Sequence, residues 1–281
     1  MRLATLRSGE TTMAAVLTDR GAVPVADASG GPLADVGALL RTGRANQLAS
    51  GALSAGTPLR FDQDDLLRPV LEPGAVFCVG LNYRPHILEM GREIPDHPTL
   101  FSKLPRALTD PYADISVPSS GAAALDYEGE LAAVIGAGGR DITTQDAWDH
   151  VAGLTVLNDI TMRDFQRRTL QWFAGKTWQD STPVGPCIVT LDELGDLGQR
   201  ELITRVNGDV RQQSRLEHLV FDVPALVADL STIVELRPGD IIATGTPGGV
   251  GEAAGRLLGD GDEVEVEIEG IGAVRNRIRV R

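Results

Sequence analysis

Short apolar runs constrain the fold of this chain more than any other feature of its sequence. From residue 75 onward, short runs rich in Val, Ile and Leu recur between glycine, proline and aspartate clusters, at 75–80, 131–135, 153–157, 187–189, 202–206 and 241–243. Short runs bounded by turn residues are typical of β-strands. Helical periodicity is clear only at 160–173 and at 223–233, where Asp222 is a suitable N-cap and Pro224 occupies the first turn. The sequence therefore predicts an α+β protein that is mostly β, with helices that cover the sheet.

The first seventy residues have a different pattern. Three β-like pieces, at 2–6, 14–17 and 22–25, are combined with one helical stretch at about 33–53. Proline and glycine then crowd the stretch at 69–74, which favours a linker. We expect a small N-terminal α+β domain at residues 1–70 and a larger domain at residues 71–281.

Charge and composition exclude several classes of partner. The chain has 26 Lys and Arg against 39 Asp and Glu, a formal charge of −13, and no basic block that would neutralise phosphates. No apolar run approaches the roughly 20 residues that cross a bilayer, and the first residues do not form the apolar core of a signal peptide. We expect a cytoplasmic protein that binds neither nucleic acid nor membrane.

The spacing of the cysteines and histidines does not indicate a zinc-type metal site. Cys78 and Cys187 lie far apart, each within an apolar run, and the four histidines form no HxxxH or HxH cluster. The cysteines are predicted to be buried, reduced thiols. Any metal in this protein would have to bind through oxygen.

Two glutamates precede the apolar run at 131–135. Residues two apart on an extended strand point to the same face, so Glu128 and Glu130 would lie about 6 to 7 Å apart along it. Such a pair either faces solvent or shares a cation, and hard divalent cations prefer carboxylate oxygens. The chain contains a solvated example at 263–269, where glutamate alternates with Val and Ile. After Glu130, however, every position is apolar, as in a strand buried on both faces, so a metal site and an ordinary acidic strand both stay open.

Other candidate residues each have an ordinary structural interpretation. Asp159 follows the apolar run at 153–157, where it would be a metal ligand or a helix N-cap. His86 and Glu89 lie three apart, which on a helix gives a base oriented by a carboxylate or an exposed ion pair. Lys176 lies among aromatic residues, where it would bind a substrate anion or extend to solvent over an apolar patch.

Taken together, these motifs resemble the fumarylacetoacetate hydrolase family, which includes acylpyruvate hydrolases, isomerases and decarboxylases. The resemblance spans about residues 76–281 and rests on the order of five motifs: FCVGLNY at 77–83 followed by His86 and Glu89, DYEGEL at 126–131, NDITMRDFQ at 158–166, GK at 175–176, and TGTPGGVG at 244–251. It implies a mixed β-sandwich roll with a small N-terminal domain, assembled as a homodimer.

The resemblance also assigns roles to residues. It implies that Glu128, Glu130 and Asp159 bind Mg²⁺ or Mn²⁺, with Ca²⁺ as an alternative, and that His86 and Glu89 activate water. Lys176 would contact the water or substrate oxygens as a third catalytic group. The expected substrate contacts are Arg163, Gln166, Gly245 and Thr246, with Arg84 replacing another family contact. Pro85, directly before His86, departs from the family pattern, but proline is tolerated in a first helical turn.

The implied substrate is a small 2-oxo acid. Because both His86 and Glu89 are present, our leading expectation is hydrolysis of a C–C bond in a 2,4-dioxo acid, which releases pyruvate and a carboxylic acid. The first alternative is an isomerase, tautomerase or decarboxylase that acts on a 2-oxo or 2-hydroxydienoic acid such as oxaloacetate. The second is a scaffold protein without catalytic activity.

Overall fold

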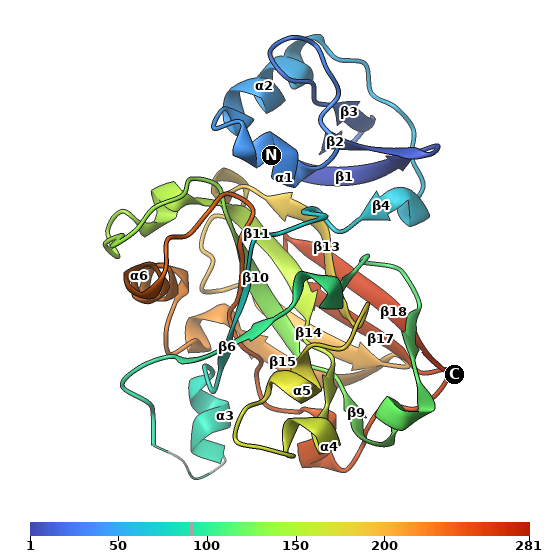
Figure 1. The fold of residues 1–281 in the computed structure, drawn as a ribbon, viewed down its shortest axis with the longest axis vertical. Coiled ribbons are helices and arrows are strands. Elements are labelled where there is room, and N and C mark those ends of the chain that lie inside the picture. Colours follow the sequence, from blue (N-terminus) through green and yellow to red (C-terminus); the bar gives the residue numbers. More distant parts are fainter. Residues whose placement is uncertain (90, 92) are drawn as a thin grey trace.

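Two β-sheets packed face to face form the body of the protein (Figure 1). The structure is a computed structural model that describes residues 1–89, 91 and 93–281, with the backbone only for Glu89. The larger sheet has eleven strands, nine of them in the order β3-β2-β1-β13-β11-β10-β16-β5-β6, with β4 beside β1 and β7 beside β13. The second sheet has five strands in the order β15-β14-β17-β18-β8, and β9 pairs with β12 separately. This arrangement confirms the predicted α+β, mostly β class.

The strands of the large sheet have the following bounds: β1 (Arg2–Ser8), β2 (Thr11–Thr18), β3 (Gly21–Pro24), β4 (Leu66–Leu67), β5 (Val76–Gly80), β6 (Thr99–Lys103), β7 (Leu108–Thr109), β10 (Gly129–Ile135), β11 (Val151–Asn158), β13 (Thr182–Val189) and β16 (Ile241–Ala243). The others are β8 (Ile115–Val117), β9 (Leu125–Asp126), β12 (Thr161–Met162), β14 (Glu201–Val206), β15 (Asp209–Arg215), β17 (Glu263–Ile268) and β18 (Gly272–Val280). Each of the six apolar runs that begin at residue 75 and beyond contributes to a strand.

The α-helices are short: α1 (Val36–Arg41), α2 (Ala45–Ala55), α3 (Arg84–Glu89), α4 (Arg163–Gln166), α5 (Phe173–Lys176), α6 (Val223–Ile233) and α7 (Gly251–Ala254). Helix α6 confirms its prediction, since the Asp222 side chain accepts from the Ala225 N–H. No helix in the described part of the chain is long and apolar enough to cross a membrane.

Two predicted helices were wrong in extent. The stretch at 33–53 is broken into α1 and α2, because Gly43 has a positive φ of 67° that interrupts the helix. The stretch at 160–173 contains β12 and the single turn of α4. Asp159 is therefore not a helix N-cap: Met162 holds that position before α4.

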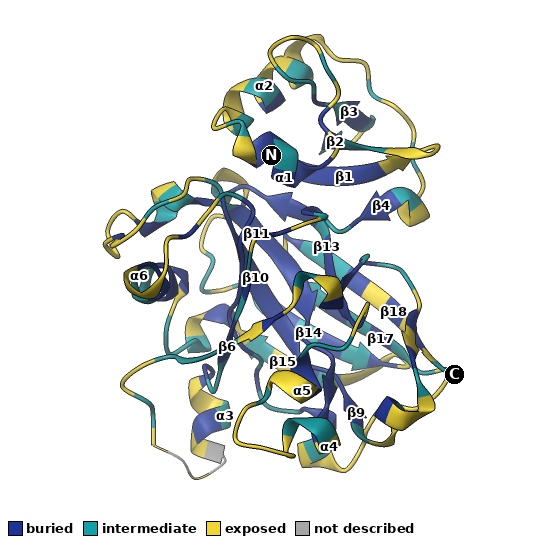
Figure 2. Cartoon of the chain, viewed as in Figure 1, coloured by how far each residue is buried: buried dark blue, intermediate teal, exposed yellow. Residues whose placement is uncertain are grey.

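Strand β10 is buried on both faces, as its unbroken apolar sequence predicts (Figure 2). Leu131, Ala133 and Ile135 pack into the core shared with the five-stranded sheet. Ala132 and Val134 point the other way, into a core that includes residues of β1, α1 and α2. Because β10 has no solvent face, a polar side chain in it needs a partner inside the protein.

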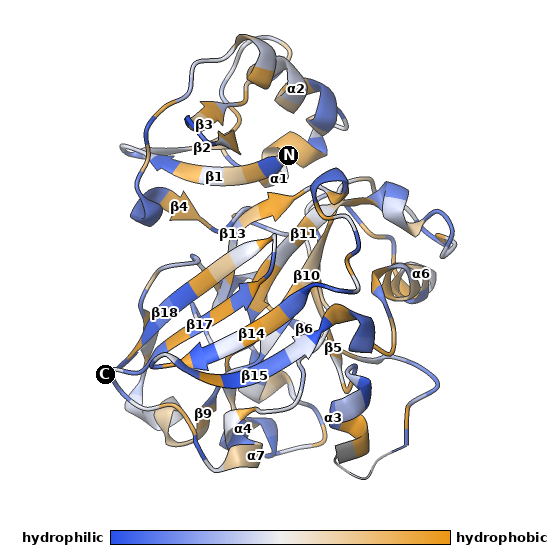
Figure 3. Ribbon diagram, turned by 180° about the vertical axis from the view of Figure 1, so that it is seen from behind, coloured by the Kyte–Doolittle hydropathy of each residue, from blue (hydrophilic) through white to orange (hydrophobic). Residues whose placement is uncertain are grey.

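Strand β17 shows the opposite pattern, with half-buried glutamates alternating with buried apolar residues. Figure 3 shows the same alternation of hydrophilic and hydrophobic positions across β14, β17 and β18. Arg205 on β14 bridges Glu265 and Glu267 at 2.9 and 2.7 Å. This run is the amphipathic strand that its alternation predicts.

The N-terminal segment extends the large sheet. Arg2 and Leu3 of β1 pair antiparallel with Val189 and Ile188 of β13, and β2 and β3 follow outward. The buried face of α1, with Val36 and Leu39, packs in the core that also contains Val134 of β10. The division of the chain at residue 70 stays a prediction.

Two neighbouring positions on β17 provide a test of this packing. We expect Val266→Ala to lower the free energy of unfolding by about 2 kcal/mol, because it removes two methyl groups from a fully buried site. Glu267→Ala, whose ion pair is at the surface, should change it by less than about 0.5 kcal/mol. Urea denaturation of both variants measures the difference; equal losses would contradict the assigned register.

Candidate active site

Three buried carboxylates lie together where β10 begins and β11 ends. Oxygen atoms of Glu128, Glu130 and Asp159 all lie within 4.8 Å of one another. The antiparallel register pairs Gly129 with Asn158, and the Asp159 N–H donates to the Glu128 carbonyl at 2.8 Å, so the two strand ends are joined. The expectation that Glu128 and Glu130 aim together is confirmed. They are not a solvated pair: Glu128 is 8% exposed and Glu130 is 1% exposed.

Glu130 is the least compensated of the three. Its carboxylate accepts the Gly245 N–H at 2.8 Å, and in the described part of the chain no Lys or Arg forms an ion pair with it. Burial, together with the negative charges of Asp159 and Glu128, raises the pKa of Glu130 well above its ordinary value. A cation at this position would relieve both effects.

Two buried lysines neutralise Asp159. Lys103 and Lys176 each form an ion pair with it, the second at 2.8 Å, and Lys176 also contacts Glu128 at 2.5 Å. Burial acts to raise the pKa of Asp159, but the two ammonium groups outweigh it and lower that pKa. Burial acts to lower the pKa of Lys176, and Asp159 and Glu128 reverse this effect, so Lys176 is cationic at neutral pH. Lys176 is 2% exposed, which excludes the surface position considered from sequence.

Arg163 joins Glu128 to a fourth carboxylate. Its Nη1 lies 2.7 Å from Glu128, and its Nε donates to Asp126 at 2.8 Å. Asp126 also accepts the N–H groups of Gly251 and Glu252, at 2.7 and 3.0 Å, at the start of α7. Asp126 therefore fixes both the guanidinium and the short helix beside the carboxylates.

Two glycines permit this close packing. Gly245 has a positive φ of 97°, and a Cβ on it would lie 2.8 Å from the Val79 carbonyl oxygen. Without that side chain, its N–H can reach Glu130. A Cβ on Gly175 would lie 2.5 Å from the backbone nitrogen of Gln166, so this glycine lets α5 approach α4 and bring Lys176 inward.

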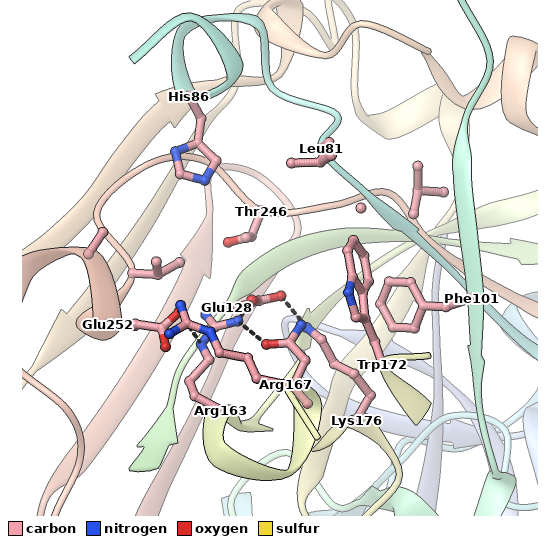
Figure 4. Close-up of a pocket in the computed structure, with 15 residues that line it drawn as sticks. Leu81, His86, Phe101, Glu128, Arg163, Arg167, Trp172, Lys176, Thr246 and Glu252 are labelled. Carbon is pink, nitrogen blue, oxygen red and sulfur yellow. Dashed lines mark hydrogen bonds and ion pairs between the residues drawn. The ribbon is translucent and has the colours of Figure 1, made fainter. Parts of the chain in front are cut away.

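A pocket of about 430 Å³ opens over Glu128 (Figure 4), whereas Glu130 and Asp159 are not among its described lining residues. Its lining includes six candidate residues from the sequence: His86, Glu128, Arg163, Gln166, Lys176 and Thr246. Phe101 and Trp172 lie on one side, with their rings edge to face at 5.5 Å between centroids. The pocket therefore has a charged base and an aromatic wall.

Among the described side chains, the remaining candidates form no hydrogen bond or ion pair with the carboxylates. Glu89 ends the same helix as His86, but its side chain lies outside the described residues, so the pairing of the two stays a prediction. Arg84 is exposed and is not among the described residues that line the pocket, so its role as a substrate contact also stays a prediction. Gln166 donates nothing to the carboxylates; its Oε1 accepts from Arg163 at 3.0 Å.

Sequence reasoning missed three residues that support the site. Lys103 is at the end of β6, far from any motif, and only its burial identifies it. Asp126 stands inside a recognised motif without an assigned role. Gln212 of β15 is 1% exposed and holds three groups: its Oε1 accepts from Gly129 N–H, and its Nε2 donates to Thr246 Oγ1 at 2.8 Å and to the Pro247 carbonyl. Gln212 stands among other polar residues of β15, so the sequence did not distinguish it from its neighbours.

The donor set suits a hard divalent cation. Glu128, Glu130 and Asp159 offer carboxylate oxygens, the ligands that such cations prefer, and Glu130 has a carboxylate without an ion-pair partner in the described part of the chain. The cluster therefore can hold a metal ion.

Comparisons with known proteins agree with this geometry. A family model described as fumarylacetoacetate (FAA) hydrolase C-terminal matches residues 75–279. The chain is 41% identical over 215 residues to oxaloacetate tautomerase YisK from Bacillus subtilis (strain 168), covering 75% of this chain and 71% of that protein.

Solved structures give the same result over the full chain. A fumarylacetoacetate hydrolase from the psychrophilic Exiguobacterium antarcticum superposes with a TM-score of 0.89 at 35% identity, covering 100% of both chains. A maleylpyruvate hydrolase from Sphingobium sp. SYK-6, solved with manganese(II) and pyruvate, superposes with a TM-score of 0.80 at 27% identity, covering 100% of this chain and 99% of that one.

The contribution of the Lys103–Asp159 ion pair to the free energy of unfolding can be measured. We expect Lys103→Met to lower the free energy of unfolding by about 3 kcal/mol in a chelator, because it removes one of the two cations beside a fully buried carboxylate. Asp159→Asn in the same background should recover part of this loss. Urea denaturation of the two single variants and the double variant gives the coupling energy; additive losses would show that the pair does not contribute.

Proposed function

The chain belongs to the fumarylacetoacetate hydrolase family, and we propose that it is a divalent-metal-dependent tautomerase that interconverts the keto and enol forms of oxaloacetate or a closely similar 2-oxo acid. The observation that carries this proposal is a buried carboxylate triad, beside a cationic lysine and under a histidine-lined pocket, in a chain 41% identical to an oxaloacetate tautomerase. The comparisons favour this alternative over the hydrolysis that we expected first.

Glu128, Glu130 and Asp159 would hold Mg²⁺ or Mn²⁺. The manganese in a related hydrolase supports this choice of ion. When bound, a divalent cation polarises the carbonyl oxygen of a 2-oxo acid and makes the neighbouring C–H more acidic. Gly245 supports the set by holding Glu130 through its N–H.

Lys176 and His86 would carry out the remaining chemistry. Lys176 is held cationic by the carboxylates, so it would stabilise the negative charge that develops on the substrate's 2-oxygen rather than act as a base. His86 lines the same pocket, and an imidazole exchanges protons near neutral pH, so it would move the proton at C3. Glu89 would orient that imidazole. Thr246, held by Gln212, and Arg163 would contact the substrate carboxylate.

Hydrolysis of a 2,4-dioxo acid is the second candidate. The same pocket would place water near His86, and the two structural relatives compared above are hydrolases by name. The two candidates differ in product: tautomerisation moves one proton between oxygen and C3 and leaves the carbon skeleton intact, whereas hydrolysis breaks a C–C bond and releases pyruvate.

An assay with three substrates separates these functions. We expect purified protein with Mg²⁺ to accelerate the loss of enol absorbance from oxaloacetate without increasing the release of pyruvate from it. The protein should also release little pyruvate from acetylpyruvate. His86→Ala should lower kcat for tautomerisation by about 100-fold or more, because proton transfer by a positioned group contributes that much. His218→Ala, which removes a histidine bonded to Ser214 on β15, is the matched control and should retain activity.

Pyruvate release is the deciding measurement. Metal-dependent release from acetylpyruvate or from fumarylpyruvate, faster than oxaloacetate tautomerisation, would replace the proposal with hydrolysis. Metal-dependent release from oxaloacetate would indicate decarboxylation. The absence of all three activities from folded, metal-loaded protein would favour the scaffold interpretation.

Metal binding can be measured separately from activity. We expect Mn²⁺ to raise the melting temperature of the chelator-treated protein, and to raise it more at pH 8 than at pH 5. The sign follows from Glu130: its raised pKa keeps it protonated at lower pH, so the cation must displace a proton there. Glu130→Gln should abolish most of the shift. An equal shift in this variant would place the metal elsewhere.

A further inference from the structure

One arginine at the pocket differs from the other cations of the site. Arg167 caps the C-terminus of α4 and lines the pocket, yet its side chain is 68% exposed, whereas Lys103, Lys176 and Arg163 are buried. Its Nη2 lies 2.5 Å from Glu252 Oε2 on α7. A guanidinium has five N–H donors, so this contact leaves most of them available for an anion.

Glu252 is a fixed counter-charge for Arg167. Its backbone N–H donates to Asp126 Oδ2 at 3.0 Å, and the preceding Gly251 N–H donates to Asp126 Oδ1 at 2.7 Å. Asp126 is fully buried and also binds Arg163, so the start of α7 is anchored to the floor of the site. The Glu252 carboxylate therefore pairs with the Arg167 guanidinium at the rim of the pocket, where Arg167 stays exposed.

The pocket has two chemically different sides. Figure 4 shows Arg163, Arg167 and Glu252 together on one side of Glu128, and Phe101 and Trp172 on the other. A substrate whose 2-oxo acid end lies over Glu128 and Lys176 would extend toward one of these sides. Among the described lining residues, the aromatic side offers no cation other than Lys176, which is already paired twice, so a second carboxylate would be stabilised better on the charged side.

We propose that Arg167 is a specificity-determining residue that binds the second carboxylate of a dicarboxylic 2-oxo acid. This inference rests on the proposed function for the placement of the 2-oxo acid end. On binding, the guanidinium exchanges part of its contact with Glu252 for a charge-assisted contact with the substrate. Arg163 differs from Arg167: its side chain is 8% exposed, its Nε and Nη1 bind Asp126, Glu128 and Gln166, and the proposed function assigns its remaining nitrogen, Nη2, to the carboxylate at the 2-oxo acid end.

Arg168 provides a matched control. It is the next residue, is similarly exposed at 55%, and pairs with Asp164 at 3.9 Å. Its guanidinium lies over the Phe165 ring at 3.3 Å, and it is not among the described residues that line the pocket. Arg167→Met and Arg168→Met therefore remove the same charge, one at the pocket and one beside it.

The test compares two substrates that differ only in the second carboxylate. For oxaloacetate, we expect Arg167→Met to raise KM about tenfold or more while kcat changes little, because one charge-assisted contact is lost. For the 4-methyl ester of oxaloacetate, KM should be nearly the same in wild type and Arg167→Met. Inhibition by oxalate, which lacks the distal group, should also be unchanged. Arg168→Met should resemble wild type in all three measurements.

A binding measurement separates this inference from the proposed activity. The probe is 3,3-difluorooxaloacetate, which has no C3 proton and cannot enolise, and calorimetry with Mg²⁺ gives its Kd. A Kd raised about tenfold in Arg167→Met supports the inference even when wild type shows no tautomerase activity, in which case only the proposed function fails. Equal Kd values in wild type and Arg167→Met, equal losses for oxaloacetate and its ester, or no binding to wild type would each overturn the inference.

Discussion

The structure depends on the compensation of negative charge inside its core. Glu128, Glu130 and Asp159 are all buried, and buried carboxylates are tolerated only beside cations or hydrogen-bond donors. Lys103 and Lys176 reach them from β6 and from α5. Segments far apart in the chain must therefore dock correctly before the charge is balanced, which links the position of each to the integrity of the site.

The negative charge of the cluster is not fully compensated, and this leaves a position that a divalent cation could fill. Among the described residues, Asp159 has two ammonium partners, whereas the Glu130 carboxylate accepts one backbone N–H, and burial raises the pKa of Glu130. A divalent cation would supply the missing positive charge. Lys176, which neutralises part of the carboxylate charge, also lines the pocket. Its cationic ammonium group is therefore available to a substrate anion in the proposed function. In the proposed function, one group therefore has both a structural and a catalytic role.

Local sequence predicted the parts of this structure that depend on local patterns. Apolar runs located the strands, and alternation distinguished the exposed face of β17 from doubly buried β10. The motif order predicted the family and the residues that gather in the site. Lys103 and Gln212 could not be found in this way, because their roles arise from pairing between distant strands and leave no periodic signal. The helix expected at 160–173 failed for a related reason: Thr161 and Met162 pair as a strand with Asp126 and Leu125 of β9, a partner distant in sequence.

The pairing of β1 with β13 has a consequence for dissecting the protein. Residues 75–279, which match the family model, would lack β1, which pairs with Ile188 and Val189, and the apolar residues of α1 that share a core with Val134. An unprotected strand edge beside an exposed apolar surface is prone to pair with another chain. The N-terminal segment thus shields the sheet that carries the carboxylates from aggregation, and a fragment cut at the family boundary would be expressed without that shield.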